Sequence, residues 1–316
     1  MLRSLFSGIS GLRVNQTMLD VTGNNISNAN TVGFKSSQTV FSDTLSQMLT
    51  AAAAPAASGN TGGTDPVQIG LGVQVAAVKT NFTQGANETT GVATDMMLSG
   101  DGFFVVNDGQ NNYLTRAGAF SFDQDGDMVA PDGKYVQGYA GISGYNADGS
   151  PSYSADTGAA GLSKLNLTSM AQNATQAAHD SGLTDSTGGP VKVGDALQSY
   201  EIGSDGTVTG TFAGGEKLAL GRIAVANVQN PQGLEKSGDS EYVASANSGT
   251  VVFATAGANT TVGQNGKITT GALEMSNVDL SSEFTNLILA QRGFEASSKV
   301  ITTSDTVLGD LINMIH

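Results

Sequence analysis

The chain has 316 residues, enough for two or three domains, and no cysteine, which excludes disulfides, thiol catalysis and cysteine metal sites. Its 42 glycines and only 13% charged residues favour many tight turns and a largely neutral, polar surface, as in all-β proteins. The net charge of −14 and the lack of basic patches argue against nucleic-acid binding, and no stretch is long and apolar enough to insert into a membrane.

A helix is predicted over residues 1–30, because apolar residues recur there at heptad spacing. The segment lacks the uninterrupted apolar core and cleavage site of a signal peptide, so we expect it to stay in the mature protein. Its Asn-rich end and Gly33 predict where the helix stops. The apolar ladder consists of Leu2, Leu5, Ile9, Leu12, Gln16, Leu19 and Ile26, with Gly23 filling the one gap.

A second short helix is predicted over residues 34–49 and a flexible linker over residues 51–66, which are rich in Ala, Gly and Ser. From Val67 to about Tyr145 the pattern is that of β-strands, with alternation near Val73 and a short apolar run from Phe103. Asp-Gly pairs between these runs predict type I′ hairpin turns, which need positive φ at both positions. The pairs begin at Asp101, Asp108, Asp125, Asp132, Asp148 and Asp205.

Residues 146–196 contain few large apolar side chains and predict either part of a small insert domain or a loosely packed segment. Strands predicted over Ser199–Ile202 and Thr207–Phe212 close this insert. A longer strand over Leu218–Val228 returns the chain to the central β region. Further turns and short strands follow up to residue 275.

The last segment, residues 279–316, predicts a helix roughly 55 Å long, with Asp279 or Ser281 as its N-cap. A long helix without cover is marginal, so it needs partner helices. The N-terminal helix is one partner, and we expect other copies of the chain to cover the remaining faces. Its ladder consists of Leu280, Phe284, Leu287, Gln291, Phe294, Ser298, Ile301, Asp305, Leu308, Ile312 and Ile315, in which the polar members fix the register.

The predicted fold is therefore mainly β with long terminal α-helices, which pair as a coiled coil and enclose nested β domains. The predicted domains are a helical domain (1–30 and 279–316), a connecting segment (31–66 and 271–278), a central β domain (67–145 and 216–270) and an outer insert domain (146–215).

Segments spread over the whole chain resemble the rod and hook family of bacterial flagellar axial proteins, and within it most closely the hook proteins. The segments are Leu19–Lys35, Gly100–Val106, Tyr113–Phe120, Asn230–Leu234, Leu273–Leu280 and Gln291–Phe294. The residues singled out in the terminal motifs are Asn24, Asn25, Asn28, Asn30, Gly33, Phe34, Lys35, Ser276, Asn277, Gln291 and Arg292.

This resemblance implies a structural subunit that polymerises into a curved, flexible tube, a universal joint that transmits torque from motor and rod to filament. The terminal helices would form an inner tube around an export channel. The implied partners are other copies of the chain, the rod, the hook cap, the hook-filament junction proteins and the type III export apparatus. The implied location is the flagellum outside the cell, reached without cleavage of a signal peptide. Expected subunit-packing residues are Leu2, Leu5, Ile9, Leu12, Leu19, Leu280, Phe284, Leu287, Phe294, Ile301, Leu308 and Ile312.

Two alternatives stay open. A distal rod subunit shares the terminal motifs, and the long stretch over residues 48–70 favours it, whereas the insert favours the hook. A secreted adhesive β protein would not account for the terminal helices. An enzyme is not expected, because no acid, base or nucleophile residues converge.

The remaining site hypotheses are weak. Residues 123–127 resemble the start of a calcium loop, but Lys134 stands where a bidentate Glu is needed, so a turn is favoured and no metal or cofactor is expected. His179 and His316 are read as surface residues. Phe41 and Leu45 form either an export-gate motif or the apolar face of a short helix. The Asn-rich stretch is read as a helix terminus at a junction rather than a binding face.

Overall fold

The computed structural model describes residues 2–54, 62–145, 151–153, 158, 161–183 and 191–315. The chain forms two compact units. Unit 1 comprises Met1–Ala29, Ser36–Asn81 and Val278–His316, and unit 2 comprises Asn30–Lys35 and Phe82–Asn277. The fourfold division of the chain given above stays a prediction, and the boundaries of these two units differ from it.

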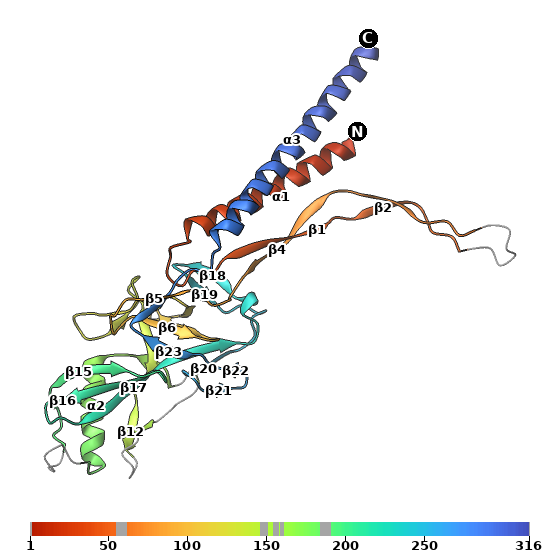
Figure 1. Ribbon diagram of the computed structural model, residues 1–316. Coiled ribbons are helices and arrows are strands. Elements are labelled where there is room, and N and C mark those ends of the chain that lie inside the picture. Colours follow the sequence, from red (N-terminus) through yellow and green to blue (C-terminus); the bar gives the residue numbers. More distant parts are fainter. Residues whose placement is uncertain are drawn as a thin grey trace. The chain divides into compact units, whose positions relative to one another are not determined.

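Two long helices dominate unit 1, α1 (Leu2–Ser27) and α3 (Leu280–Ile315), and they lie side by side in Figure 1. Both predicted terminal helices are thereby confirmed. The carboxylate of Asp279 accepts a hydrogen bond from the backbone N–H of Ser281, so Asp279 is the N-cap of α3. Of the helices that the structure describes, none combines the length and the apolarity that a membrane span requires.

The rest of unit 1 is a pair of antiparallel ladders, and the helix predicted over residues 34–49 is wrong. β1 (Ser37–Asp43) pairs with β4 (Val73–Thr80), and β2 (Ser46–Thr50) pairs with β3 (Val67–Gly70). The strands form because each finds its partner far along the chain, and such a pairing overrides a local helix pattern.

The linker predicted over residues 51–66 lies between β2 and β3. Its two described ends pair through a bridge between Ala53 and Thr64. Residues 55–61 lie outside the described residues.

Unit 2 is built on one antiparallel sheet, in which strands follow the order β15-β16-β17-β11-β7-β8-β19-β18, with β9, β10, β14 and β20 attached. Short strand pairs, β12-β13, β21-β22, β6-β23 and β5-β24, complete the unit. The sheet strands are β7 (Phe103–Asn107), β8 (Asn112–Thr115), β9 (Ser121–Phe122), β10 (Met128–Val129), β11 (Tyr135–Tyr139), β14 (Ser163–Lys164), β15 (Leu197–Ile202), β16 (Thr207–Phe212), β17 (Lys217–Val228), β18 (Glu235–Gly238), β19 (Glu241–Val243) and β20 (Val251–Thr255). The paired short strands are β5 (Asn87–Thr89), β6 (Met96–Ser99), β12 (Ile142–Tyr145), β13 (Pro151–Tyr153), β21 (Asn259–Thr260), β22 (Gly263–Gln264), β23 (Lys267–Thr270) and β24 (Ala272–Glu274).

The described part of the predicted insert shares the core of the central β region. A single hydrophobic cluster joins Phe104 of β7, Met170 of the helix α2 (Leu167–Asp180) and Phe212 of β16. Sequence reading missed α2, whose buried face consists mostly of small alanines. Asn166 caps this helix by accepting a hydrogen bond from the backbone N–H of Ser169.

The Asp-Gly turns differ from the predicted type I′ geometry. The pair that begins at Asp148 lies outside the described residues. In the other pairs the glycine has positive φ, as at Gly109 and Gly133, but the preceding Asp does not. Two consecutive non-glycine residues with positive φ, Asp239 and Ser240, occur instead in the tight connection between β18 and β19. Asp-Gly therefore marked the position of turns correctly and their type wrongly.

Candidate functional site

The two helices of unit 1 meet along a stripe of small residues. The hydroxyl oxygens of Ser4 and Ser304 lie 3.3 Å apart. Two turns further along α1, a Cβ on Gly11 would lie 2.8 Å from Oγ of Ser297. Contacts that advance along α1 therefore go back along α3, so the helices are antiparallel. Glycine at the contact lets the two backbones approach closely.

Most of the predicted ladder lies beside this stripe; the exception is Ile301, whose Cγ1 would lie 3.1 Å from a Cβ on Gly8. Leu12 follows Gly11, and Ser298 follows Ser297, so each ladder is displaced from the contact by one residue, about 100° around the helix. Phe284 remains 52% exposed. Pairing of these two ladders within one chain as a coiled coil is therefore not confirmed. Of the expected packing residues, Leu280, Phe284, Phe294 and Ile312 are exposed and Leu5, Ile9, Leu12, Leu19, Leu287, Ile301 and Leu308 are half-buried, while the side chain of Leu2 lies outside the described residues.

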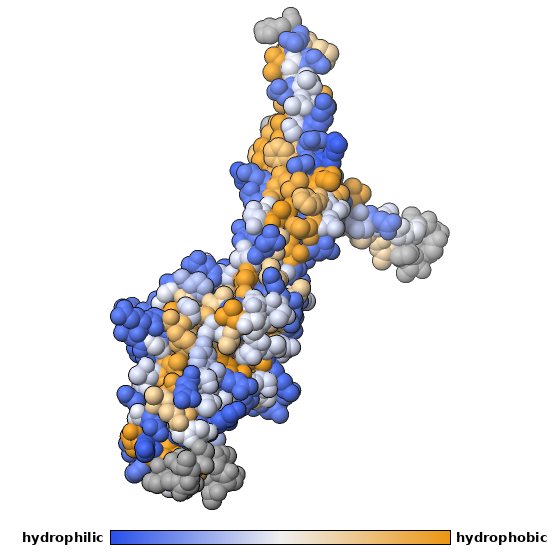
Figure 2. Space-filling model, turned by 60° about the vertical axis from the view of Figure 1, so that its left-hand side comes forward, coloured by the Kyte–Doolittle hydropathy of each residue, from blue (hydrophilic) through white to orange (hydrophobic). Residues whose placement is uncertain are grey.

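The two displaced ladders fall on the same side of the helix pair. Both are rotated from the contact in the same sense, and in an antiparallel pair equal rotations lead to one common side. Figure 2 shows apolar residues gathered along the helices. We call this surface the ladder face; it consists of Leu5, Ile9, Leu12, Leu19, Leu280, Phe284, Phe294 and Ile312, with the exposed polar residues Gln291, Ser298 and Asp305 among them.

Asn25 is a buried junction residue of unit 1. Its side-chain amide donates hydrogen bonds to the backbone oxygen of Ser37 at 2.8 Å and to a carboxylate oxygen of Glu283 at 3.0 Å. Its amide oxygen accepts from the backbone N–H of Ser37 at 3.0 Å. The side chain thus joins α1, β1 and α3. This supports the interpretation of the Asn-rich stretch as a helix terminus at a junction, in preference to a binding face. Burial raises the pKa of the Glu283 carboxyl above its ordinary value, against the effect of the bond from Asn25.

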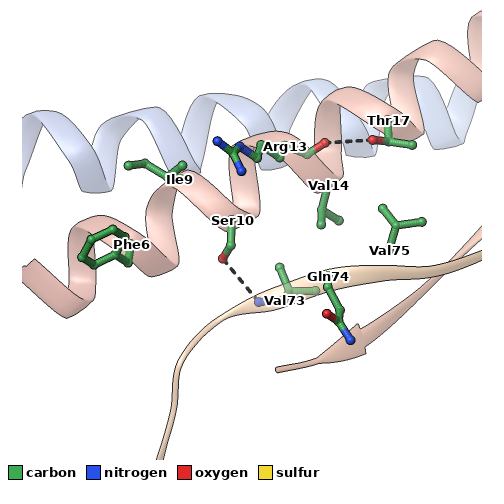
Figure 3. A pocket seen from close by; sticks show the side chains of 9 residues that line it. All are labelled: Phe6, Ile9, Ser10, Arg13, Val14, Thr17, Val73, Gln74 and Val75. Atoms are coloured by element: carbon green, nitrogen blue, oxygen red, sulfur yellow. Dashed lines mark hydrogen bonds between the residues drawn. The ribbon is translucent and has the colours of Figure 1, made fainter. Parts of the chain in front are cut away.

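A groove of about 510 Å³ lies between α1 and β4. Figure 3 shows its walls, with Phe6 and Arg13 on the helix and Val73 and Val75 on the strand side. The hydroxyl of Ser10 accepts a hydrogen bond from the backbone N–H of Val73, which ties the strand to the helix. The groove is mainly apolar and, like the ladder face, offers room for another apolar surface.

Phe41 lies on a strand and Leu45 in the connection between two strands, and neither belongs to a helix. Phe41 belongs to β1, opposite Val75, and Leu45 directly precedes β2. Their exposed fractions are 40% and 82%. The alternative of a short helix with an apolar face is therefore wrong, and the export-gate motif stays a prediction.

Unit 2 contains a fully buried ion cluster that brings together three of the family-like segments. Nζ of Lys35 lies 2.5 Å from a carboxylate oxygen of Glu274, and Nη1 of Arg116 lies 3.5 Å from the other oxygen. Burial lowers the pKa of Lys35 and of Arg116, and the carboxylate of Glu274 opposes this. Lys35 was singled out from the sequence, but its partners were missed. The sequence did offer one signal: each of these three charged residues stands in a segment with apolar neighbours, and charged residues in such segments are rarely buried without a partner.

The other residues singled out in the terminal motifs have mixed environments. Gly33 and Phe34 are buried, and Asn277 donates to the backbone oxygen of Thr83 at 3.1 Å. Asn28 donates to the backbone oxygen of Asn24. Asn24, Asn30, Gln291 and Arg292 are exposed, Asn28, Ser276 and Asn277 are half-buried, and Arg292 forms an ion pair with Glu295.

The residues at 123–127 form a turn, as favoured from the sequence. The Asp123 carboxylate accepts from the backbone N–H groups of Asp125 and Asp127. The buried carboxylate of Asp127 pairs with Lys164 at 2.7 Å. His179 is half exposed at the end of α2, and His316 lies outside the described residues.

Comparison with protein families gives three matches along the chain. Residues 5–35 match a family described as flagella basal body rod protein, residues 97–210 match the flagellar hook protein FlgE/F/G D1 domain, and residues 269–314 match the flagellar basal body rod FlgEFG protein C-terminal. These matches include both helices of unit 1 and a large part of unit 2.

Individual relatives span the whole chain. It is 40% identical to the flagellar basal-body rod protein FlgG of Bacillus subtilis over 99% of both chains. It is 30% identical to the flagellar hook protein FlgE of Borreliella burgdorferi, over 99% of this chain and 100% of the relative. A solved structure of the Helicobacter pylori hook protein FlgE2 aligns with a TM-score of 0.40 and 11% identity, over 60% of this chain and 100% of that one.

Proposed function

Because this chain belongs to the family of flagellar basal-body rod and hook proteins, we propose that it polymerises with copies of itself into the tube of the flagellar hook. It is a structural protein of the flagellum and not an enzyme. In this role the tube surrounds a central export channel. It bends while it rotates and carries torque from the rod to the filament.

The ladder face is the observation that supports polymerisation. Large apolar side chains such as Phe284 and Ile312, 52% and 58% exposed, remain uncovered after α1 and α3 have paired. Because these side chains are about half exposed, burying the rest of each one contributes about 1–1.5 kcal/mol, which favours contact between copies. In this proposal the coiled-coil pairing predicted from the heptads occurs between copies, and Gln291, Ser298 and Asp305 fix its register.

The proposal extends to the partners of the tube. The rod and the hook cap would contact its ends during assembly, and the hook-filament junction proteins would follow. Export would use the flagellar type III apparatus, with Phe41 and Leu45 on the exposed β-hairpin as a candidate gate motif. The neutral, Gly-rich surface of unit 2 would permit sliding between neighbouring copies as the tube bends.

Substitution on the ladder face tests this function. The double variant Phe284→Ser and Ile312→Ser should fold, because both side chains are exposed in the single chain, but should raise the critical concentration for polymerisation at least tenfold. Leu289→Ser is the matched control, since Leu289 is 60% exposed on the same helix and lies about half a turn from the ladder. Equal polymerisation of the double variant and the wild type, measured by sedimentation, would refute a role of the ladder face.

A second candidate is the distal rod. The rod protein of Bacillus subtilis aligns over 99% of both chains at 40% identity, so the two chains are of nearly equal length. Electron microscopy of the purified polymer separates the candidates, because curved tubes support a hook and straight tubes support a rod.

A further inference from the structure

The chain crosses between the two units four times, after Ala29, Lys35, Asn81 and Asn277. Inside unit 2, the residues next to these crossings belong to three segments that are far apart in the sequence. If one residue held all three segments in place, it would fix the unit 2 end of every covalent connection between the units.

Glu274 belongs to the segment that ends at Asn277, and it contacts both of the other segments directly. Its carboxylate oxygen Oε1 accepts hydrogen bonds from Nζ of Lys35 at 2.5 Å and from the backbone N–H of Gly85 at 2.9 Å. Its backbone oxygen accepts from the N–H of Gly33 at 2.7 Å. One residue therefore holds the short segment between the first two crossings and the segment that follows the third.

The same segments are also bound to one another. Nζ of Lys35 donates to the backbone oxygen of Thr83 at 2.8 Å, and the side-chain amide of Asn277 donates to that oxygen at 3.1 Å. Lys35 and Asn277 are the last residues before their crossings, and Thr83 is the second residue after one. The hydrogen bonds thus close a ring around the points where the chain leaves unit 2.

The anchor is shielded from solvent. The side chains of Lys35 and Glu274 are both 0% exposed, and Arg116 approaches the second carboxylate oxygen from inside the core. In such surroundings, removal of one partner leaves a buried charge without compensation, so the contact rarely opens. A second ion pair of unit 2, between Lys134 and the buried carboxylate of Glu241 at 2.6 Å, serves as a comparison, because Lys134, Glu241 and the further partner Asp132 all lie outside the crossing segments.

We propose that Glu274 is a clamp that fixes all the chain crossings on unit 2 and thereby restricts the movement of unit 1 relative to unit 2. Glu274 acts as a positioning residue through Lys35, Gly33 and Gly85. This role belongs to the single chain and does not depend on polymerisation.

Distance measurements between spin labels test the clamp in the soluble chain. The sequence has no cysteine, so Ala296→Cys on α3 and Gln110→Cys in unit 2, both at exposed positions, give one label in each unit. Glu274→Leu keeps the side-chain volume but removes the acceptor. We expect the width of the distance distribution to increase at least twofold. Glu241→Leu, the matched control, should keep the width of the parent.

A second variant covers the case in which Glu274→Leu fails to fold. Lys35→Met combined with Glu274→Leu removes the unpaired lysine charge, and such apolar replacement of a buried pair is often tolerated. It should show the same broadening, with a melting temperature above that of Glu274→Leu alone but below that of the parent, because Arg116 loses its carboxylate partner and keeps its bond to the backbone oxygen of Leu98. A parental width in the folded variant, or equal broadening in Glu241→Leu, would overturn the proposal.

Discussion

Gly33 meets two demands at once, and each excludes other residue types. Its φ is +69°, which L-residues with a side chain rarely adopt, and a Cβ there would clash with the backbone of Ala117. Its N–H also donates to the backbone oxygen of Glu274. Glycine at this position therefore allows the backbone of the segment that follows α1 to lie directly against the backbone of Ala117.

Gly33→Ala should destabilise unit 2 by about 3 kcal/mol or more, because backbone strain and a steric clash add up. Gly109→Ala is the control. Gly109 also has positive φ, +96°, but nothing lies within 4 Å of the added Cβ, so about 1–2 kcal/mol is expected there. Urea unfolding followed by tyrosine fluorescence measures both. Equal losses would mean that the contact with Ala117 relaxes at little cost.

Glu283 makes the stability of the helix pair dependent on pH. Burial raises the pKa of its carboxyl in the folded state, so folding favours the protonated form. The stability that this group contributes is present below its unfolded pKa and is lost as pH rises through the raised pKa. The variant Glu283→Gln does not titrate at this position. The melting temperature of the wild type, relative to that of Glu283→Gln, should therefore rise as the pH is lowered from about 7 to about 4. A constant difference between the two proteins over this range would contradict the prediction.

At the scale of elements, α1 and α3 divide their surfaces between two tasks. The stripe of small residues serves the contact within the chain, where Gly11 approaches Ser297 and Ala290 is fully buried. Most of the large apolar residues stand one position further along each helix, and Leu280, Phe284, Phe294 and Ile312 among them remain exposed. A monomer that used its large residues for its own helix pair would have none left for other copies.

Gly11→Leu should separate the helices, because a Cβ at this position already lies 2.8 Å from the Ser297 hydroxyl. Gly23→Leu is the matched control in the same helix, where nothing lies within 4 Å, and it should gain up to about 1 kcal/mol from helix propensity. Limited proteolysis of both termini, together with far-UV circular dichroism, distinguishes the two. Similar protease resistance in both variants would refute close packing at Gly11.

At the scale of the whole molecule, the hairpin formed by β2 and β3 differs from the helix pair because it buries none of the residues of its two strands. Every residue of both strands is exposed, among them Met48, Leu49 and Ile69. Exposed apolar residues on a long hairpin favour contact with other copies. We therefore propose that this hairpin influences the stiffness of an assembled tube.

Deletion of residues 51–64 should change the curvature or the stiffness of assembled tubes while leaving both units folded, because the helix pair and the main sheet do not include this segment. Electron micrographs of wild-type and shortened polymers give the curvature directly. Identical curvature and persistence length would remove the hairpin from the mechanics of the tube.

The amino-acid sequence was enough to predict the terminal helices, most strand positions in unit 2, the location of the turns and the family. These features rest on local periodicity, on Gly and Asn at chain reversals and on long motifs, all of which can be read without knowing what packs against them. It did not reveal α2, whose alanine face carries little apolar signal, nor the strands β1 and β2, whose partners lie far along the chain.

Which residues contact one another became clear from the folded chain alone. It placed most of each heptad ladder beside the helix contact, because small residues such as Gly11 and Ser297 allow a closer approach than large ones. It also joined Lys35, Arg116 and Glu274, which come from three distant segments, into one buried cluster. Periodicity fixes the face of a helix on which a residue lies, but the partner of that face depends on the whole chain.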